Sequence, residues 1–361
     1  PIGVSFYVFH AIGYIVDVFR KDTPATRSFV DFAAFMALFP HMIAGPVLRF
    51  RDLTDQFIKR EHSLPIFTSG LYIFTIGLSK KVLIADTVAP IADQTFAMAN
   101  PTMVESWLGA IAYMLQLYFD FSGYSDMAIG LALMMGFRFK QNFNTPYLSL
   151  SITEFWQRWH ISLSTWLRDY LYIPLGGNRK GSARTYVNLF LVMLLGGLWH
   201  GAAWTYVLWG AWHGAWLACE RYTGWARNVP SRAIALPVTL VLVLIGWVMF
   251  RAANVGDAFT VYGGMIGLNG ITPSIEFLAN VTRENLLFLV LAIFAVFAEP
   301  YFKKLTDAEN GIEAHGFSVS PNGTAVAIPS LAYPIAMSLL LVVTVARLSE
   351  QSVSPFLYFQ F

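Results

Sequence analysis

The chain has 361 residues, of which 56% are hydrophobic and 13% are charged, with a formal net charge of +2 and a mean hydropathy of +0.53. A soluble domain carries about twice that share of charged residues, so the composition excludes an ordinary soluble domain and indicates an integral membrane protein. The small net charge gives no support for nucleic-acid binding, and the single cysteine, Cys219, excludes an internal disulfide and a cysteine-rich metal site.

Apolar segments recur along the whole chain. A spanning helix needs about 20 mostly apolar residues. The candidate membrane segments are residues 3–19, 28–48, 66–96, 104–137, 184–219, 232–252, 283–302 and 329–348. Two of these, 104–137 and 184–219, are long enough to be helix pairs, and we expect them to be interrupted at 119–123 and at Gly196-Gly197 respectively.

Lys80 and Lys81 interrupt the third segment in the same way. We therefore count about eight to ten spans and expect residues 1–361 to form a single transmembrane domain. The chain begins at Pro1 within a sequence that already has the character of a membrane helix, so we expect earlier spans to precede it. The polar segment 305–328 is expected to be an extramembrane loop. No internal repeat is visible, which disfavours a transporter built from inverted halves.

Residues 151–171 are amphipathic and differ from the segments around them. Ser151 and Glu154 have the spacing of a capping box, which predicts that a helix begins here. The apolar face follows helical spacing and consists of Ile152, Phe155, Trp156, Trp159, Leu163, Trp166, Leu167 and Tyr170. The opposite face is polar and consists of Glu154, Arg158, Thr165 and Asp169. We expect this helix to lie in the membrane interface or against other helices.

Two histidines are candidates for chemistry. His160 projects onto the apolar face of the amphipathic segment and points inward; taken alone, it fits a hydrogen-bonded core residue better than a catalyst. His200 lies inside an apolar segment, where an ionisable residue is costly unless it faces a cavity or a partner, so we interpret it as functional. His213 lies thirteen residues further on. Along a continuous helix that separation turns through about 220° and rises about 20 Å, so we expect His213 to be structural.

The residue types around these histidines narrow the chemistry. No third ligand stands at a metal-site spacing and no Gly-x-Ser-x-Gly elbow is present, so we predict no metal, no bound cofactor and no nucleophilic triad. General base catalysis remains, in which a neutral imidazole accepts the proton of an acceptor hydroxyl as its oxygen attacks an activated acyl group. A second polar group would then hold the acceptor or stabilise the developing oxyanion.

Characteristic motifs extend nearly from end to end of the chain. They are PIGVSFY at 1–7, FPHMIAGP at 39–46, FDFSGYSD at 119–126, NFNTPY at 142–147, FWQRWHISLS at 155–164, LWHG at 198–201 and FLYFQF at 356–361. Together they resemble the membrane-bound O-acyltransferase (MBOAT) family, and within it the bacterial branch of alginate O-acetylation proteins. The resemblance implies an all-α polytopic bundle around a transmembrane tunnel, with amphipathic and re-entrant helices.

The same resemblance implies roles for the two histidines and for partners. His200 corresponds to the catalytic residue of the family, and His160 would complete the site. Acyl groups would enter from a cytoplasmic thioester donor, acetyl-CoA or an acyl carrier, and leave on the outer face of the bacterial inner membrane. A periplasmic or extracellular acetyltransferase would finish the transfer to polysaccharide.

Further residues are candidates for the substrate path. Asp120 and Asp126 are carboxylates in an apolar stretch, so we expect them to pair with Arg158 or Arg168, or to line the tunnel. The other tunnel candidates are Gln116, Tyr124, Trp156, Arg158 and Trp199. A basic group follows Gly176-Gly177 and consists of Arg179, Lys180 and Arg184. It would either steer an anionic donor to the site or form a solvated loop near anionic lipid.

Three functions remain open from the sequence. The first is an O-acetyltransferase that modifies an alginate-like exopolysaccharide. The second keeps the family and changes the cargo, to D-alanyl transfer onto teichoic acid or acyl transfer onto peptidoglycan. The third is a transporter or channel with His160 and His200 on a proton or substrate path.

Overall fold

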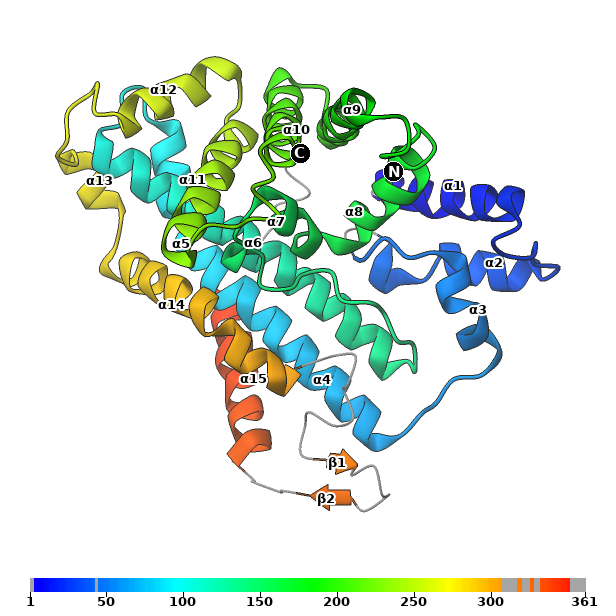
Figure 1. Ribbon diagram of the computed structural model, residues 1–361. Helices are drawn as coiled ribbons and strands as arrows, with labels where there is room; N and C mark the ends of the chain where they lie inside the picture. The colour runs from blue at the N-terminus through cyan, green and yellow to red at the C-terminus, as the bar shows by residue number, and fades with distance from the viewer. Residues whose placement is uncertain (1–2, 43–44, 307–316, 320–324, 328–331, 351–361) are drawn as a thin grey trace.

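The computed structural model describes residues 3–42, 45–306, 317–319, 325–327 and 332–350 (Figure 1). Most of these residues form helices, as expected from the sequence. The strands β1 (Phe317–Val319) and β2 (Ala325–Ala327) form a small antiparallel hairpin. The predicted polar loop 305–328 lies partly outside the described residues, and its described part contains this hairpin. The motif at 356–361 also lies outside them.

The N-terminal region contains one long helix and several short ones. They are α1 (Val4–Arg20), α2 (Phe29–Met36), a 3-10 turn η1 (Phe39–His41) and α3 (Phe50–Ile58). The expectation of a spanning helix over 28–48 is wrong, because α2 has 8 residues and extends only about 12 Å. Pro40 follows closely and has no amide hydrogen to continue the helix. Pro40 and His41 are buried, so this turn packs into the protein.

Two long helical stretches lie at the centre of the molecule and pack against each other. The first comprises α4 (Leu64–Ser79), a π-helical turn η2 (Lys80–Ala85) and α5 (Asp86–Ala97), and the second is α6 (Met103–Met134). Figure 1 shows α4 and α6 side by side through the middle of the molecule. The expected break of 104–137 is wrong, because α6 continues for 32 residues. A Cβ at Gly123 would lie 2.6 Å from the carbonyl oxygen of Gly77, so this glycine allows close helix packing.

Helices α9 (Ser182–His200) and α10 (Trp204–Thr223) form a tightly packed antiparallel hairpin. The predicted helix pair is confirmed, but its break lies at 201–203 and not at Gly196-Gly197. Gly197 is helical, and an added Cβ there would clash with the backbone carbonyl oxygen of Tyr206. Here again the glycine serves helix packing.

The remaining helices are α11 (Arg232–Arg251), α12 (Val255–Met265), α13 (Ile275–Asn280), α14 (Arg283–Thr306) and α15 (Ala332–Glu350). By length and apolar composition alone, two described helices qualify as membrane spans. The first is α11, with a mean hydropathy of 2.5 over its most apolar stretch, and the second lies within α15 at Tyr333–Glu350.

The amphipathic segment is not one helix, contrary to expectation. After a 3-10 turn η3 (Pro146–Leu148), it consists of α7 (Ile152–Arg158), α8 (Ile161–Leu167) and a π-helical turn η4 (Arg168–Tyr172). The N-terminal cap is confirmed, because Ser151 Oγ accepts a hydrogen bond from the amide of Glu154 at 3.0 Å. The chain turns sharply at His160, whose φ is 45°. This left-handed conformation costs a residue with a side chain about 1–2 kcal/mol, so neighbouring contacts must hold it.

Most of the apolar face of this segment is nevertheless buried. Ile152 and Phe155 are fully buried, and Trp159 is nearly so. The rings of Phe155 and Trp159 stack at 5.5 Å, and Trp159 contacts Trp247 of α11 at 5.0 Å between ring centroids. These contacts fix α7 and the turn after it against the long helices, which determines where His160 lies.

Candidate active site

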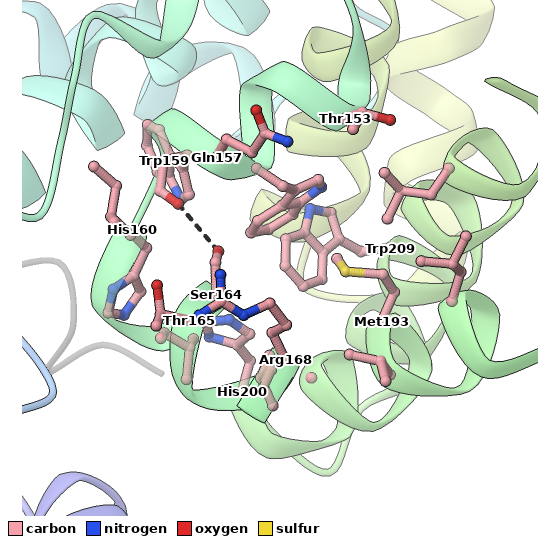
Figure 2. A pocket seen from close by; sticks show the side chains of 18 of the residues that line it. Thr153, Gln157, Trp159, His160, Ser164, Thr165, Arg168, Met193, His200 and Trp209 are labelled. Atoms are coloured by element: carbon pink, nitrogen blue, oxygen red, sulfur yellow. Dashed lines mark hydrogen bonds between the residues drawn. The ribbon is translucent and has the colours of Figure 1, made fainter. Parts of the chain in front are cut away.

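A cavity of about 560 Å³ lies where the kinked segment meets the α9–α10 hairpin (Figure 2). Its wall is contributed by α6, α7, α8, η4, α9, α10 and α11, and most of the lining side chains are apolar or aromatic. A single small substrate group at its centre would therefore contact segments that are distant in sequence. The polar lining residues are Thr153, Gln157, His160, Ser164, Thr165, Arg168, Tyr172 and His200.

His160 and His200 both line this cavity and come from separate elements. His160 stands at the turn between α7 and α8, and His200 is the last residue of α9. In Figure 2 the two side chains lie on the same side of the cavity near Thr165. The structure thus brings together the two histidines that the sequence marked as candidates.

Aromatic rings hold the imidazole of His200 in place. Its centroid lies 4.8 Å from that of Trp199, 5.2 Å from Trp209 and 5.1 Å from Phe250. The last two contacts are nearly perpendicular edge-to-face arrangements, which are favourable for aromatic groups. The ring therefore has a defined orientation in an apolar environment.

His160 is 2% exposed, and its two ring nitrogens have different surroundings. Nδ1 lies 3.2 Å from Oδ1 of Asn142, whereas Nε2 is buried without a hydrogen-bond partner among the described residues. A buried polar atom normally has a partner, so one without a partner at a cavity wall is a natural contact for a ligand. The ring of Phe121 packs against the imidazole at 4.8 Å.

His213 is fully buried and is not among the residues that line the cavity. Its Nδ1 accepts a hydrogen bond from Trp156 Nε1 at 3.3 Å, so it supports the cavity wall from behind. The helix is not continuous from His200 to His213, so the helical geometry assumed from the sequence does not apply. The ring of Trp209 lies between the imidazoles of His200 and His213 and contacts each of them at 5.2 Å between ring centroids.

Asp120 and Asp126 form ion pairs, but not with arginine. Asp120 pairs with Lys81 at 2.9 Å, and Asp126 pairs with Lys80 at 2.8 Å. The expected arginine partners are wrong, because Arg158 pairs with Glu154 at 2.6 Å and Arg168 pairs with Asp169 at 2.6 Å. The lysines lie in the π-helical turn η2, which is packed against α6.

The other sequence candidates occupy varied positions. Trp156 lines the cavity, and Trp199 contacts His200 from outside the lining. The remaining tunnel candidates are not among the residues of this cavity wall; they are Gln116, Asp120, Tyr124, Asp126 and Arg158. The basic group after Gly176-Gly177 is exposed and also lies outside the wall; it consists of Arg179, Lys180 and Arg184.

Arg168 is a cavity residue whose position the sequence did not reveal. It lies in η4, beside Asp169, which also bonds Arg49 at 2.6 Å. Burial acts to raise the pKa of Asp169, but hydrogen bonds from Arg168 and Arg49 outweigh it and hold that pKa below its ordinary value. Asp169 thus stays ionised and anchors both arginines. No pattern in the sequence marked this position, because Arg168 lies on neither the apolar nor the polar face predicted for the segment.

The site offers two imidazoles, hydroxyl groups and one cationic side chain in a largely apolar enclosure. Within the described ranges, no three His, Cys, Asp or Glu side chains converge closely enough to hold a metal ion. Imidazoles in such an enclosure can hold a substrate hydroxyl and move its proton during attack on an acyl group. The fold and the site therefore fit a membrane enzyme that performs acyl transfer.

Comparison with known proteins agrees with this class. The model of the MBOAT, membrane-bound O-acyltransferase family matches residues 19–256. A probable alginate O-acetylase AlgI of Azotobacter vinelandii is 55% identical, with 100% of this chain and 76% of that protein aligned. A peptidoglycan O-acetyltransferase of Helicobacter pylori is 37% identical over 84% of this chain and 64% of that protein. A teichoic acid D-alanyltransferase of Bacillus subtilis is 28% identical over 69% of this chain and 68% of that protein.

The chain belongs to the membrane-bound O-acyltransferase family. It is accordingly a membrane protein and an O-acyltransferase, as the sequence motifs predicted. The family match includes the kinked segment, both cavity histidines and the α9–α10 hairpin.

Proposed function

We propose that this enzyme transfers acetyl groups from a thioester donor for O-acetylation of an alginate-like exopolysaccharide, with His200 as the general base. The observation that carries the proposal is the meeting of His160 and His200 at one largely apolar cavity, although they come from separate elements. A general base must lie within hydrogen-bond reach of the hydroxyl that it deprotonates. With both imidazoles on one cavity wall, a single bound substrate would lie near both of them.

The proposed reaction needs few groups. The imidazole of His200 accepts the proton of an acceptor hydroxyl as its oxygen attacks the thioester carbonyl carbon. A carbon–oxygen bond forms, the carbon–sulfur bond breaks, and the departing thiolate takes the proton from the imidazolium and leaves as a thiol. His160 is the second polar group of the site. Most of the lining is apolar, which disfavours water as a competing acceptor.

Acceptor, partner and location follow from the relatives by inference. Identity is 55% to a probable alginate O-acetylase, against 37% to a peptidoglycan O-acetyltransferase and 28% to a teichoic acid D-alanyltransferase, which favours an alginate-like acceptor. We infer a multi-pass protein of the bacterial inner membrane that works with a periplasmic acetyltransferase. The donor would be acetyl-CoA or an acyl carrier, steered by the exposed basic residues Arg179, Lys180 and Arg184.

The test is replacement of His200 in an alginate-producing bacterium that lacks its own acetylase. We expect His200→Gln to lower the acetyl ester content of the secreted polysaccharide by about 10²-fold or more, because general base catalysis contributes about 10²–10⁴-fold. Acetyl esters would be measured chemically, and protein abundance by immunoblot of the membranes.

The matched control is His62→Gln, because His62 is exposed and does not line the cavity. It should leave acetylation and abundance at their wild-type values. Normal acetylation in the His200 variant would refute the assignment of the base. Acetyl ester on peptidoglycan or D-alanine on teichoic acid, without modified alginate, would refute the acceptor.

A further inference from the structure

The turn that carries His160 is held by Asn142, which lies in the loop after α6. The backbone carbonyl of Asn142 accepts a hydrogen bond from the amide of Ile161 at 2.9 Å. Its side-chain Oδ1 accepts from the amide of Ser162 at 3.2 Å. These two amides begin α8 and have no acceptor within the helix. Asn142 therefore caps α8 from another segment and stabilises the left-handed turn at His160.

The orientation of the Asn142 amide group follows from its partners. The amide nitrogen of Ser162 can only donate, so the atom that faces it must be the oxygen. On the other side, Nδ2 of Asn142 donates to Ser125 Oγ at 3.0 Å. A flipped amide would place two donors against each other at Ser162. Oδ1 thus faces the turn, and the same oxygen lies 3.2 Å from Nδ1 of His160.

This oxygen determines the tautomer of His160. An acceptor at 3.2 Å requires a hydrogen on Nδ1, because a bare nitrogen would direct its lone pair at the lone pairs of Oδ1. The alternative donor to Nδ1 is the hydroxyl of Ser162, at 3.5 Å. That hydroxyl instead donates to Oδ1 at 2.8 Å, and Ser162 Oγ accepts from the amide of Val47 at 2.9 Å. The shorter bond prevails, so neutral His160 carries its proton on Nδ1.

We propose that Asn142 is a positioning residue that keeps neutral His160 protonated on Nδ1, so that Nε2 accepts a hydrogen bond from a second hydroxyl of the acceptor sugar while His200 takes the proton of the attacking hydroxyl. This inference rests on the proposed function. It decides between the two roles open to the second polar group, because stabilising the oxyanion would require a hydrogen on Nε2. Nε2 is buried, has no partner among the described residues, and belongs to a side chain that lines the cavity.

The tautomer is measured directly by nitrogen NMR of protein with ¹⁵N-labelled histidine in lipid nanodiscs. His160→Gln identifies the resonances of His160 by their loss. In the wild type we expect a protonated Nδ1 and a bare Nε2. Asn142→Leu, which has similar size and no acceptor, should move the proton to Nε2 wholly or in part. A wild-type Nε2 that carries the proton would overturn the inference, as would an unchanged tautomer in Asn142→Leu.

Two variants separate this effect from a loss of structure. Asn142→Asp keeps an oxygen at the same place, so it should retain the wild-type tautomer and rescue much of the activity. Ser125→Ala removes only the bond to Nδ2, and the amide of Ser162 still requires an oxygen, so the tautomer should not change. Failure of Asn142→Asp to retain the tautomer in folded protein would refute the role of Asn142.

Acetyl transfer from labelled acetyl-CoA tests the consequence. Asn142→Leu should lower kcat by about 10²-fold, which corresponds to about 3 kcal/mol, because loss of a buried hydrogen bond to the acceptor costs up to that amount, whereas Asn142→Asp should stay within about tenfold of wild type. An altered tautomer with full activity would show that Nε2 does not bind the acceptor. If His200→Gln transfers acetyl normally while His160 shows the expected tautomer, the proposed function fails and the geometry at His160 stands.

Discussion

The close packing of α9 on α10 positions His200, and Gly197 offers a direct way to perturb it. In Gly197→Ala the new Cβ would lie inside 3.0 Å of the carbonyl oxygen of Tyr206, whereas ordinary contact begins at 3.4 Å. The helices must separate by about 1 Å to relieve the clash. Overpacking of this kind costs about 1–3 kcal/mol, offset by up to about 1 kcal/mol of improved helix propensity.

The effect on activity should exceed the effect on stability. His200 is the last residue of the same helix, so a shift of α9 moves its imidazole by a similar amount. A misplacement of about 1 Å can lower a catalytic rate by about 10²-fold. We therefore expect Gly197→Ala to fold with a Tm a few degrees below wild type, and to lose most of its acetyl transfer activity. Thermal unfolding in detergent and transfer from labelled acetyl-CoA measure the two quantities.

The neighbouring Gly196 provides the control for stability. A Cβ at Gly196 would meet only Leu167 Cδ1, at 3.7 Å, which is ordinary contact. Gly196→Ala should therefore keep or raise the Tm, because alanine favours the helix. Full activity in Gly197→Ala, at a Tm equal to that of Gly196→Ala, would show that close packing at Gly197 does not position His200.

Three further predictions concern buried polar contacts. Glu220 accepts three hydrogen bonds at the start of α7, and Glu220→Ala should therefore lower the free energy of unfolding by about 2–4 kcal/mol in a thermal assay. Glu220→Gln keeps one acceptor oxygen and should lose less; equal losses in the two variants would refute this account. Lys81→Met leaves the carboxylate of Asp120 buried without this partner, which should lower the free energy of unfolding by about 3–5 kcal/mol. Adding Asp120→Leu should recover much of this loss; an unchanged stability in Lys81→Met would show that the pair has no structural role. The pKa of Asp169 is held below its ordinary value despite burial, so its contribution to stability is present above about pH 4 and lost as the pH falls through the lower folded pKa. The Tm difference between wild type and Asp169→Asn should shrink at low pH, and a constant difference would contradict the assignment.

The class of the protein and most of its helices could be predicted because their signals are local. Long apolar segments correspond to α1, α6, α11 and α14, since the length of an apolar stretch is readable in the sequence. Glycines gave wrong breaks for a physical reason. A glycine can either interrupt a helix or let another backbone approach closely, because it has no Cβ. Gly123 and Gly197 do the second, and only the packed structure distinguishes the two cases.

The site depends on contacts between distant residues, which the sequence alone does not reveal. Periodicity predicted that His160 points inward, and it does, although the helix that justified the prediction ends at Arg158. The turn that replaces this helix is stabilised by Asn142, from a separate loop. Likewise, Asp120 pairs with a lysine in another helix and not with the arginines expected from chemical type.

The central claim is that acyl transfer takes place at the cavity shared by His160 and His200. Its most direct test is single-turnover acetyl transfer by purified protein in proteoliposomes, with binding of labelled acetyl-CoA measured separately. We predict that His200→Gln binds the donor as wild type does and transfers acetyl at least about 10²-fold more slowly. Transfer at the wild-type rate by this variant would contradict the claim.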